Sequence, residues 1–303
     1  MNKILVTGGT GLVGKYLKDI MPDAIYISSK DYDLTKENDV ESLFKRYKPK
    51  TVIHLAAKVA GIQTNIAYPT EYLEENILMN TFMIKYAHQY QVDRFIGIIS
   101  TCSYPDRVDR YPMQEKYLFN GPPAITNLSY AYAKRIMAIQ IDSYNKQYLT
   151  NWNYLIPCNL YGEYDEFSEF KSHMVSALIK KIYEAKDSIN LFGTGKPLRQ
   201  FMYAGDLAVL IKIMIKKNII ENVNVAPNEN YTIKEIANIG IKACKKPYLK
   251  INWDKTKPDG QFRKDVTSKK LLSVLPGFAF TSLEDGIRKT YTYYKQNIAW
   301  ENK

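Results

Sequence analysis

The sequence predicts an α/β fold built on a doubly wound parallel sheet, and three observations lead to this prediction. Short β-rich runs alternate with helical segments from the N-terminus to about residue 160. A glycine-rich turn follows the first run and opens the first helical segment. The 303 residues suffice for one such domain together with a smaller lobe. Strands that alternate with helices form a parallel sheet covered on both faces.

The elements of the first half are predicted from β-rich composition for the strands and from helical periodicity of the apolar residues for the helices. In chain order, the expected strands are residues 3–6, 24–28, 51–55, 94–99 and 153–156. The expected helices are residues 15–21, 37–47, 69–90 and 130–148, with a proline-containing loop at residues 105–127.

After Tyr161-Gly162 the regular alternation ends, which predicts a smaller C-terminal α/β lobe whose elements interleave with the sheet domain. We expect helices at residues 172–185, 233–244 and about 283–297, a strand at 188–192, a loop at 193–197, and strands at 201–203 and 222–225 that return to the sheet. The stretch between residues 244 and 283 is lysine-rich and predicted to be rich in loops. The sheet domain is therefore assigned to residues 1–165, with returning elements at about 196–228, and the lobe to residues 166–195 and 229–303.

Composition excludes several classes of protein. Hydrophobic residues make up 46% of the chain and charged residues 24%, which is typical of a globular protein and not of a disordered one. No apolar run is long enough to span a bilayer, and the first three residues lead directly into a strand, so we expect neither a membrane segment nor a leader. Cys102, Cys158 and Cys244 give no disulfide framework and no zinc-site spacing, which predicts a cytoplasmic protein with free thiols and no metal.

The formal charge of +11 is unusual and is concentrated near the C-terminus, where residues 238–303 hold 14 Lys and Arg against 6 Asp and Glu. Such an excess suggests an anionic partner: nucleic acid, a membrane surface or a phosphorylated small molecule. No helix-turn-helix, zinc or aromatic RNA-binding motif accompanies it, so we do not expect nucleic acid or a membrane as partner. We interpret most of the tail's excess as solvated surface and expect the cations that contact ligands to lie elsewhere in the chain.

The glycines after the first strand predict a dinucleotide site. Gly8 allows a tight turn, Gly11 lets a pyrophosphate approach the backbone at the helix N-terminus, and Gly14 permits close packing of helix on strand. Because the pattern follows a strand and opens a helix, it is more specific than an isolated glycine motif. The predicted cofactor contacts of this turn are Gly8, Gly11, Leu12, Val13 and Gly14.

The end of the second strand favours NADP over NAD. A carboxylate at its tip would bind both ribose hydroxyls and repel a 2′-phosphate. Here Ser28 and Ser29 supply hydroxyls and Lys30 a cation, which suit that phosphate, the alternative being that Lys30 is a solvated loop residue. The remaining predicted contacts are Asp33 and Leu34 near the adenine, and Ala56 and Ala57, whose small side chains suit backbone close to a cofactor.

Tyr130 and Lys134 are predicted to carry acid–base chemistry. The chain holds four Tyr-x-x-x-Lys pairs, about as many as chance provides, but only this pair begins a helix after the fourth strand, which ends at Ser100. A hydride transferred to a ketone produces an alkoxide, which a tyrosine can protonate. We expect Lys134 and an oxidised nicotinamide to lower the pKa of Tyr130, Lys134 also to hold the nicotinamide ribose, and Ser100 to polarise the carbonyl.

Taken together, these motifs resemble the extended short-chain dehydrogenase/reductase family, and within it the GDP-L-fucose synthase group. The glycine and Tyr/Lys motifs occur throughout the extended reductases, whereas other segments are more specific to the GDP-sugar group. Those segments are Ser100-Thr101-Cys102, Asn120-Gly121-Pro122-Pro123 and Lys257-Pro258-Asp259-Gly260.

This resemblance implies a Rossmann-type NADP-binding domain, a GDP-sugar-binding lobe, a homodimer paired through helices 69–90 and 130–148, and a set of site residues. Ser100, Tyr130 and Lys134 match the reductase triad, and Cys102 and His173 match the epimerase base and acid. Other implied contacts, at the nicotinamide, are Pro157, Cys158, Asn159, Leu160 and His173. The implied GDP-sugar contacts are Asn159, Lys181, Phe192, Arg199 and Asp259.

Departures from the group's pattern gather at the sugar end of the site. They are Ala60, Ser103-Tyr104, Cys158, residues 168–171 and Phe192. Three hypotheses follow: a GDP-4-keto-sugar epimerase–reductase, a C4-reductase alone that acts on a GDP-4-keto-heptose or a related sugar, and a non-catalytic NADP-binding regulator. The intact Ser100, Tyr130 and Lys134 argue against the regulator.

Overall fold

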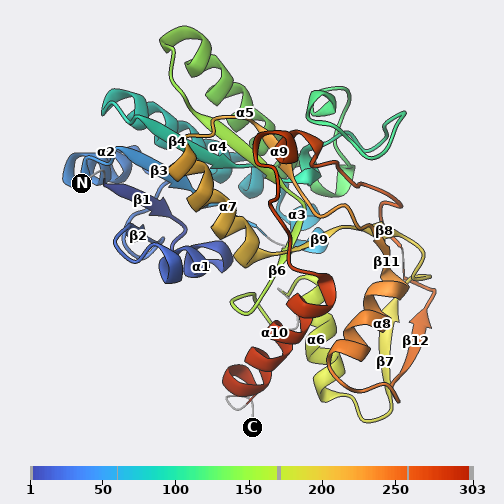
Figure 1. Ribbon diagram of the computed structural model, residues 1–303. Helices are drawn as coiled ribbons and strands as arrows, with labels where there is room; N and C mark the ends of the chain where they lie inside the picture. Colours follow the sequence, from blue (N-terminus) through green and yellow to red (C-terminus); the bar gives the residue numbers. More distant parts are fainter. Residues whose placement is uncertain (1–2, 60, 169–171, 258, 300–303) are drawn as a thin grey trace.

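The computed structural model describes residues 3–59, 61–168, 172–257 and 259–299. Ala60, residues 169–171 and Pro258, quoted above, lie outside these residues. The centre of the fold is a six-stranded parallel sheet in the order β10-β5-β4-β3-β1-β2 (Figure 1). Its strands are β1 (Ile4–Thr7), β2 (Ile25–Ile27), β3 (Thr51–His54), β4 (Arg94–Ile98), β5 (Asn153–Pro157) and β10 (Val223–Val225).

Helices cover both faces of the sheet, as predicted. On one face α1 (Leu12–Ile20) packs beside α7 (Ala204–Lys217), and on the other α2 (Glu37–Tyr47), α4 (Pro69–Gln89) and α5 (Leu128–Tyr148) lie side by side. Strand order reverses between β1 and β3, so the carboxyl ends of these two strands border the crevice in which such sheets bind ligands.

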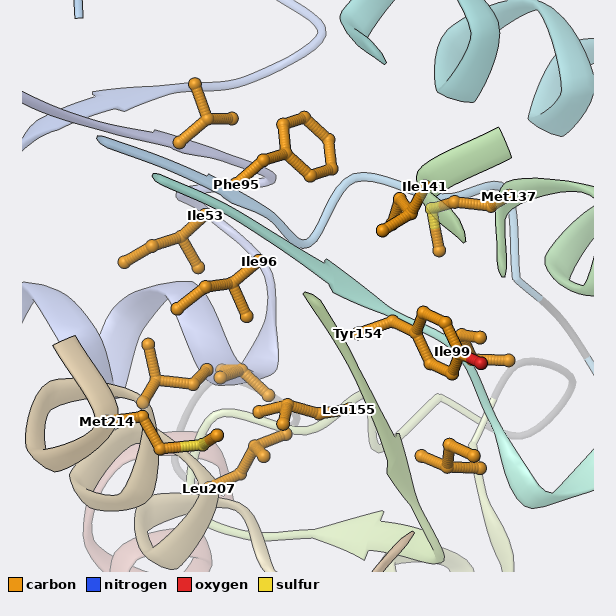
Figure 2. Packing of buried hydrophobic residues seen from close by; sticks show 14 of the residues in the cluster. Ile53, Phe95, Ile96, Ile99, Met137, Ile141, Tyr154, Leu155, Leu207 and Met214 are labelled. Carbon is orange, nitrogen blue, oxygen red and sulfur yellow. The ribbon is translucent and has the colours of Figure 1, made fainter. Parts of the chain in front are cut away.

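Apolar side chains leave the sheet on both sides because its strands are buried between two helical layers. Figure 2 shows Ile53, Ile96 and Leu155 on the side of Leu207 and Met214 of α7, and Phe95 on the opposite side. Gly97 in β4 lets α5 approach closely, since a Cβ there would lie 2.9 Å from Cδ1 of Ile141. Helix α5 is thereby held against the strand that leads to Ser100.

The second half forms the smaller lobe around a separate hydrophobic cluster (Figure 1). It contains a parallel pair, β7 and β12, beside α8, and the helices α6, α8 and α10 pack on one another. Two short pairs, β6 with β9 and β8 with β11, lie between lobe and sheet domain. The bounds are β6 (Asn159–Tyr161), α6 (Met174–Glu184), β7 (Ser188–Phe192), β8 (Leu198–Arg199), β9 (Phe201–Tyr203), β11 (Tyr231–Thr232), α8 (Ile233–Ala243), β12 (Lys250–Asp254) and α10 (Leu283–Tyr293).

Several expectations for this half were wrong. The strand predicted at residues 201–203 exists but pairs with β6 instead of returning to the central sheet, whereas 222–225 does return, as β10. The lysine-rich stretch predicted as loop contains β12 and α9 (Lys269–Val274), because its apolar residues are too sparse to reveal a half-exposed strand or a short helix. Helix α7 was not predicted. The domain boundaries stay a prediction. Within residues 229–303, which we assigned to the lobe, Val266, Leu271 and Leu275 pack in the core of the sheet domain.

The shorter helical segments include α3 (Ile62–Ala67) and 3₁₀ turns at Thr101–Ser103, Glu115–Tyr117 and Ile125–Asn127 in the sheet domain, and a π-turn at Tyr294–Ile298 that follows α10 in the lobe. Across the parts of the chain that the structure describes, no helix combines the length and apolarity needed to cross a membrane.

Candidate active site

The turn between β1 and α1 fits a bound pyrophosphate. Gly8 has φ +68°, a left-handed conformation, and a Cβ on it would lie 2.9 Å from the backbone nitrogen of Ala56. A Cβ on Gly14 would collide with the Gly8 carbonyl oxygen, so helix and turn pack without side chains between them. Around Gly11 only that same oxygen, at 3.3 Å, lies within 4 Å of a Cβ among the described residues, and no described side chain caps α1. Its first N–H groups are therefore open to an anion.

Gly9 belongs to this turn as well, although the motif spacing did not single it out. Its N–H donates to the carbonyl oxygen of Ile27 at 2.8 Å, and a Cβ on it would lie 2.8 Å from the Tyr26 Cβ. The signal was available as an unexplained fourth glycine in the turn. Gly9 thus joins the phosphate-binding turn to β2, whose end carries the residues expected to select the cofactor.

At the end of β2 an aspartate folds back on a serine. The Asp31 carboxylate accepts hydrogen bonds from the backbone nitrogen and the hydroxyl of Ser28, both at 2.8 Å. Ser29 and Lys30 are exposed, and the Lys30 backbone nitrogen donates to the Ser28 hydroxyl at 3.3 Å. Because one of its oxygens is held inside the turn, Asp31 braces the loop while Lys30 stays open to a ligand.

The next predicted adenine contacts differ in exposure. The Asp33 carboxylate accepts hydrogen bonds from the Thr35 hydroxyl and backbone nitrogen and lies 3.4 Å from the Lys36 ammonium. Leu34 is buried in the core of the sheet domain. The structure therefore puts Asp33 at the surface of the turn and Leu34 beneath it.

A buried polar chain joins the phosphate-binding turn to α5. The Ala56 N–H donates to the Thr7 hydroxyl at 3.1 Å, and this hydroxyl lies 2.8 Å from Nδ1 of His54. Nε2 of His54 lies 3.0 Å from the Asn80 side-chain oxygen, and the Asn80 amide donates to the carbonyl oxygen of Ala133 at 3.4 Å. Burial, reinforced by the Lys134 charge, lowers the pKa of His54 to about 3, so the imidazole is neutral and donates through Nε2.

Lys134 and Tyr130 lie on one face of α5 at the end of β4. The Lys134 ammonium donates to the carbonyl oxygen of Ile98 at 2.8 Å and lies 5.9 Å from the centre of the Tyr130 ring. Burial lowers the pKa of Lys134 to about 7. Burial, and secondarily Cys102, raises the pKa of Tyr130. We expected Lys134 to lower the pKa of Tyr130. Within the chain itself this does not happen, because burial also lowers the pKa of Lys134 and so weakens its positive charge. Tyr130 is therefore held as a neutral phenol.

Cys102 lies two residues beyond Ser100, in the 3₁₀ turn at the end of β4. The Ser100 hydroxyl accepts a hydrogen bond from the Cys102 backbone nitrogen at 3.2 Å. Burial alone raises the pKa of Cys102, but Lys264, a hydrogen bond from Ser100 and the Arg199 charge outweigh it, so the pKa lies below its ordinary value. Arg135 fixes the loop beyond the turn, donating to the carbonyl oxygens of Ser103 at 2.6 Å and Gly121 at 2.7 Å. These contacts favour the thiolate form of Cys102.

Lys264 is a residue that sequence reasoning missed. Its ammonium lies 3.4 Å from the Cys102 sulfur, so the tail places a cation beside a predicted site residue. Two flanking contacts hold its segment: Val266 exchanges hydrogen bonds with the Gln200 side chain, and Thr267 donates to the carbonyl oxygen of Met113. The only sequence signal was the position of Lys264 shortly after the Lys257–Gly260 motif.

His173 is positioned at the start of α6, with its ring half exposed. Its Nδ1 lies 3.3 Å from the Asp165 carboxylate. The hydrogen bond that His173 donates to Asp165 outweighs partial burial, and Cys102 adds to it, so the pKa of His173 is raised. Because Cys102 acts electrostatically on His173, the two predicted epimerase groups lie near each other although they come from different elements.

The predicted sugar-nucleotide contacts are brought together around the turn after β7. Asp259 accepts hydrogen bonds from the backbone nitrogen of Thr194 at 2.6 Å and from its hydroxyl at 2.7 Å. The Lys181 ammonium lies 5.2 Å from the Phe192 ring centre, and this ring is 62% exposed, an unusual exposure for Phe. Arg199 is half-buried and electrostatically coupled to both Asp259 and Cys102.

Asn159 connects the end of β5 to this region. Its side-chain amide donates to the Gln200 carbonyl oxygen at 2.7 Å, next to Arg199. Pro157 and Cys158 are buried and Leu160 is half-buried, and burial raises the pKa of Cys158. Cys158 is therefore a buried packing residue with a raised pKa, whereas the pKa of Cys102 is lowered.

These features define an enzyme with a dinucleotide-binding sheet and an acid–base site above it. Residues 4–226 match the model of the NAD dependent epimerase/dehydratase family, and the chain belongs to that family. It is 35% identical to a probable GDP-L-fucose synthase of Drosophila melanogaster over 98% of either chain. A GDP-L-fucose synthetase from Naegleria fowleri, solved with NADP, superposes with a TM-score of 0.88 at 32% identity, covering 98% of this chain and 94% of the other.

A second solved relative is named for a different activity. A GDP-6-OMe-4-keto-L-xylo-heptose reductase from Campylobacter jejuni superposes with a TM-score of 0.89 at 25% identity, covering 97% of both chains. The chain is therefore an NAD(P)-dependent enzyme of the nucleotide-sugar epimerase/reductase group.

Proposed function

We propose that the protein reduces the C4 ketone of a GDP-4-keto-sugar with NADPH and also inverts neighbouring carbons, as a GDP-L-fucose-synthase-like epimerase–reductase. The observation that carries this proposal is the Lys264 ammonium 3.4 Å from the Cys102 sulfur, two residues from Ser100 and beside Tyr130. An activated thiol beside the ketone supplies the base that epimerisation needs and that C4 reduction does not.

NADPH, when bound, supplies the hydride that reduces the C4 carbon. Tyr130, held as a phenol, donates its proton to the C4 oxygen as negative charge develops there. The Ser100 hydroxyl donates a hydrogen bond to the same oxygen. Lys134 holds the nicotinamide ribose and, when protonated, offsets the charge left on Tyr130.

For epimerisation, Cys102 removes the acidic proton from a carbon beside the ketone, and the electron pair moves into an enolate whose oxygen Ser100 and Tyr130 stabilise. His173, protonated, then donates a proton to the opposite face of that carbon. The lowered pKa of Cys102 and the raised pKa of His173 favour these two starting forms at the same pH.

The cofactor and substrate assignments use the remaining predicted residues. We assign the pyrophosphate to Gly8, Gly11, Leu12, Val13 and Gly14, and the 2′-phosphate to Ser28, Ser29 and Lys30. Asp33, Leu34, Ala56 and Ala57 are assigned to the adenosine side, and Pro157, Asn159, Leu160 and His173 to the nicotinamide. Lys181, Phe192, Arg199 and Asp259, with Asn159, are assigned to the GDP-sugar.

A second candidate function is C4 reduction alone, on a GDP-4-keto-heptose. It is supported by the similarity to the heptose reductase and by the departures at the sugar end, where Phe192 and Cys158 are among the replaced residues. A heptose carries one more carbon than a 6-deoxyhexose and has hydroxyl groups on C6 and C7, which an altered pocket has to accommodate.

Deuterium incorporation tests the choice between these two functions. The enzyme is incubated with GDP-4-keto-6-deoxy-mannose in D₂O without NADPH, and deuterium at C3 and C5 is followed by NMR. Epimerase activity predicts incorporation well above the enzyme-free rate, and incorporation at the enzyme-free rate would remove it. Turnover with NADPH on this sugar and on a GDP-4-keto-heptose then identifies the preferred substrate.

We also propose a homodimer paired through α4 and α5. Both helices carry apolar side chains that are more than one-third exposed in the single chain: Leu78 on α4, and Leu128, Tyr132 and Ile139 on α5. Burying such a stripe against a second copy removes it from water. The thiol chemistry of Cys102 suits the reducing cytoplasm, where we place the enzyme.

A further inference from the structure

Asp165 is a buried carboxylate that neither the motifs nor the proposed mechanism uses. It lies in the segment between β6 and α6, and its side chain is 4% exposed. One carboxylate oxygen accepts from the Glu166 backbone nitrogen at 2.9 Å and faces Nδ1 of His173 at 3.3 Å. The other accepts a hydrogen bond from the Ser176 hydroxyl in the first turn of α6. A carboxylate so enclosed has no freedom to turn away from the imidazole.

The contact determines which nitrogen of His173 carries the proton in the neutral ring. A carboxylate accepts hydrogen bonds and cannot donate one, so Nδ1 must carry hydrogen and Nε2 is left to exchange protons. The titratable groups that act on His173 are Asp165 and, with a smaller effect, Cys102, and both favour its charged form. The ring is half exposed, so it can also exchange protons with water.

We propose that Asp165 is a positioning residue that fixes the Nδ1–H form of His173 and thereby presents Nε2 as the proton donor for epimerisation. This inference rests on the proposed epimerase function of Cys102 and His173. The proton balance of one inversion is complete: Cys102 gains the proton taken from carbon, and His173 loses one from Nε2 to the opposite face. Both groups return to their starting forms by exchange with solvent.

The alternative is that Asp165 only anchors the N-terminus of α6. It would do so through Ser176 and through its own backbone nitrogen, which donates to the Gly162 carbonyl oxygen at 3.1 Å. The two roles differ in one respect: an anchor affects stability, whereas a positioning residue also determines the tautomer and charge of His173.

Asp165→Asn separates these roles because it keeps the shape and removes the negative charge. In the asparagine the Glu166 backbone nitrogen holds the amide oxygen on the side of Nδ1, and the amide nitrogen donates to the Ser176 hydroxyl, so the contacts persist while the charge beside the imidazole is lost. The chain has only three histidines, so ¹⁵N-histidine NMR of the whole protein resolves His173 from His54 and His88. In wild type we expect the neutral ring of His173 to carry its hydrogen on Nδ1, and in the variant we expect the titration midpoint of His173 at lower pH. Hydrogen on Nε2 in wild type, or an unchanged midpoint in the variant, would overturn the proposal.

Deuterium exchange supplies the functional readout. We expect Asp165→Asn to slow exchange at C3 and C5 of GDP-4-keto-6-deoxy-mannose by about tenfold to a hundredfold, the range that second contacts to a reacting imidazole commonly contribute. The control variant is Asp187→Asn, which removes an exposed carboxylate of the same lobe. It should catalyse deuterium exchange at C3 and C5 at the wild-type rate.

Failure of this inference can be told apart from failure of the proposed function. If wild type itself does not exchange deuterium, the epimerase function is wrong, while the NMR experiment still tests the Asp165–His173 relationship. If wild type exchanges and Asp165→Asn exchanges equally fast with the same pH profile, Asp165 has no positioning role. NADPH binding measured by fluorescence should be unchanged in both variants, and a loss in Asp165→Asn would indicate the anchoring role instead.

Discussion

The Lys264 ammonium lies 3.4 Å from the Cys102 sulfur although 162 residues separate the two in the chain. The contact depends on a tail segment that crosses back over the sheet domain and is fixed by Gln200 and Met113. A cation at this distance favours the thiolate, which is the form that can take a proton from carbon.

Replacing Lys264 by Met should therefore raise the pKa of Cys102 and slow epimerisation. The pH dependence of alkylation by iodoacetamide reports this change, because Cys158 and Cys244 are buried and burial raises the pKa of both. We expect the alkylation midpoint to move to higher pH and deuterium exchange to fall by at least about tenfold. Lys255→Met, an exposed lysine of the same tail, is the control. An unchanged alkylation profile would mean that Lys264 does not activate the thiol.

Tyr130→Phe tests the reductase half. The phenol proton is the one expected to reach the C4 oxygen, so its removal should lower NADPH consumption by about a hundredfold or more. NADPH binding should persist, because the phosphate-binding turn and the Lys134 contact to Ile98 are untouched. Stopped-flow absorbance at 340 nm gives the rate and fluorescence titration the affinity; wild-type turnover in this variant would refute the mechanism.

His54 should make the fold sensitive to acid. Its folded pKa of about 3 lies below the unfolded value of about 6.5, so between these values the unfolded chain binds a proton that the folded chain does not. Stability is present above pH 6.5 and is lost as the pH falls toward 3, which amounts to about 2 kcal/mol between pH 7 and pH 5. Urea unfolding at these two pH values measures the loss, and the difference should shrink in His54→Gln. An equal loss in both proteins would assign the acid sensitivity to other groups.

Much of the site was predictable because it follows from short-range chemistry. Gly8, Gly11 and Gly14 lie in one turn, and Tyr130 and Lys134 on one helix face, so spacing alone determines their geometry. Lys264 and Asp165 were missed for the opposite reason: each acts on a residue of another element, through tertiary packing that no local pattern encodes. The pairing of β9 with β6 is equally non-local, since three apolar or aromatic residues fit either sheet.

The exposed stripe on α4 and α5 predicts a dimer that one charge can break. Ile139→Arg would place a guanidinium at the centre of the proposed interface, where burying it without a partner is costly. Light scattering should give twice the chain mass for wild type and the single chain mass for the variant. Val209→Arg is the matched control, because Val209 is comparably exposed but lies on α7 at the opposite face of the sheet. If both variants remain dimeric, the interface lies elsewhere.

Selection of the cofactor should depend on Lys30 and not on Asp31. The Asp31 carboxylate is occupied by the Ser28 backbone nitrogen and hydroxyl, so it is not free to bind ribose hydroxyls as the acidic residue of an NAD site does. Lys30 is exposed beside it, in reach of a 2′-phosphate. Lys30→Ala should weaken NADPH binding by about tenfold, the usual value of one exposed charge-assisted contact, and leave NADH binding unchanged. Asp31→Ala should loosen the turn and weaken binding of both cofactors alike. Calorimetric titration of each of the two variants with each of the two cofactors measures these affinities. Equal losses of affinity for NADPH and NADH in Lys30→Ala would show that Lys30 does not bind the 2′-phosphate.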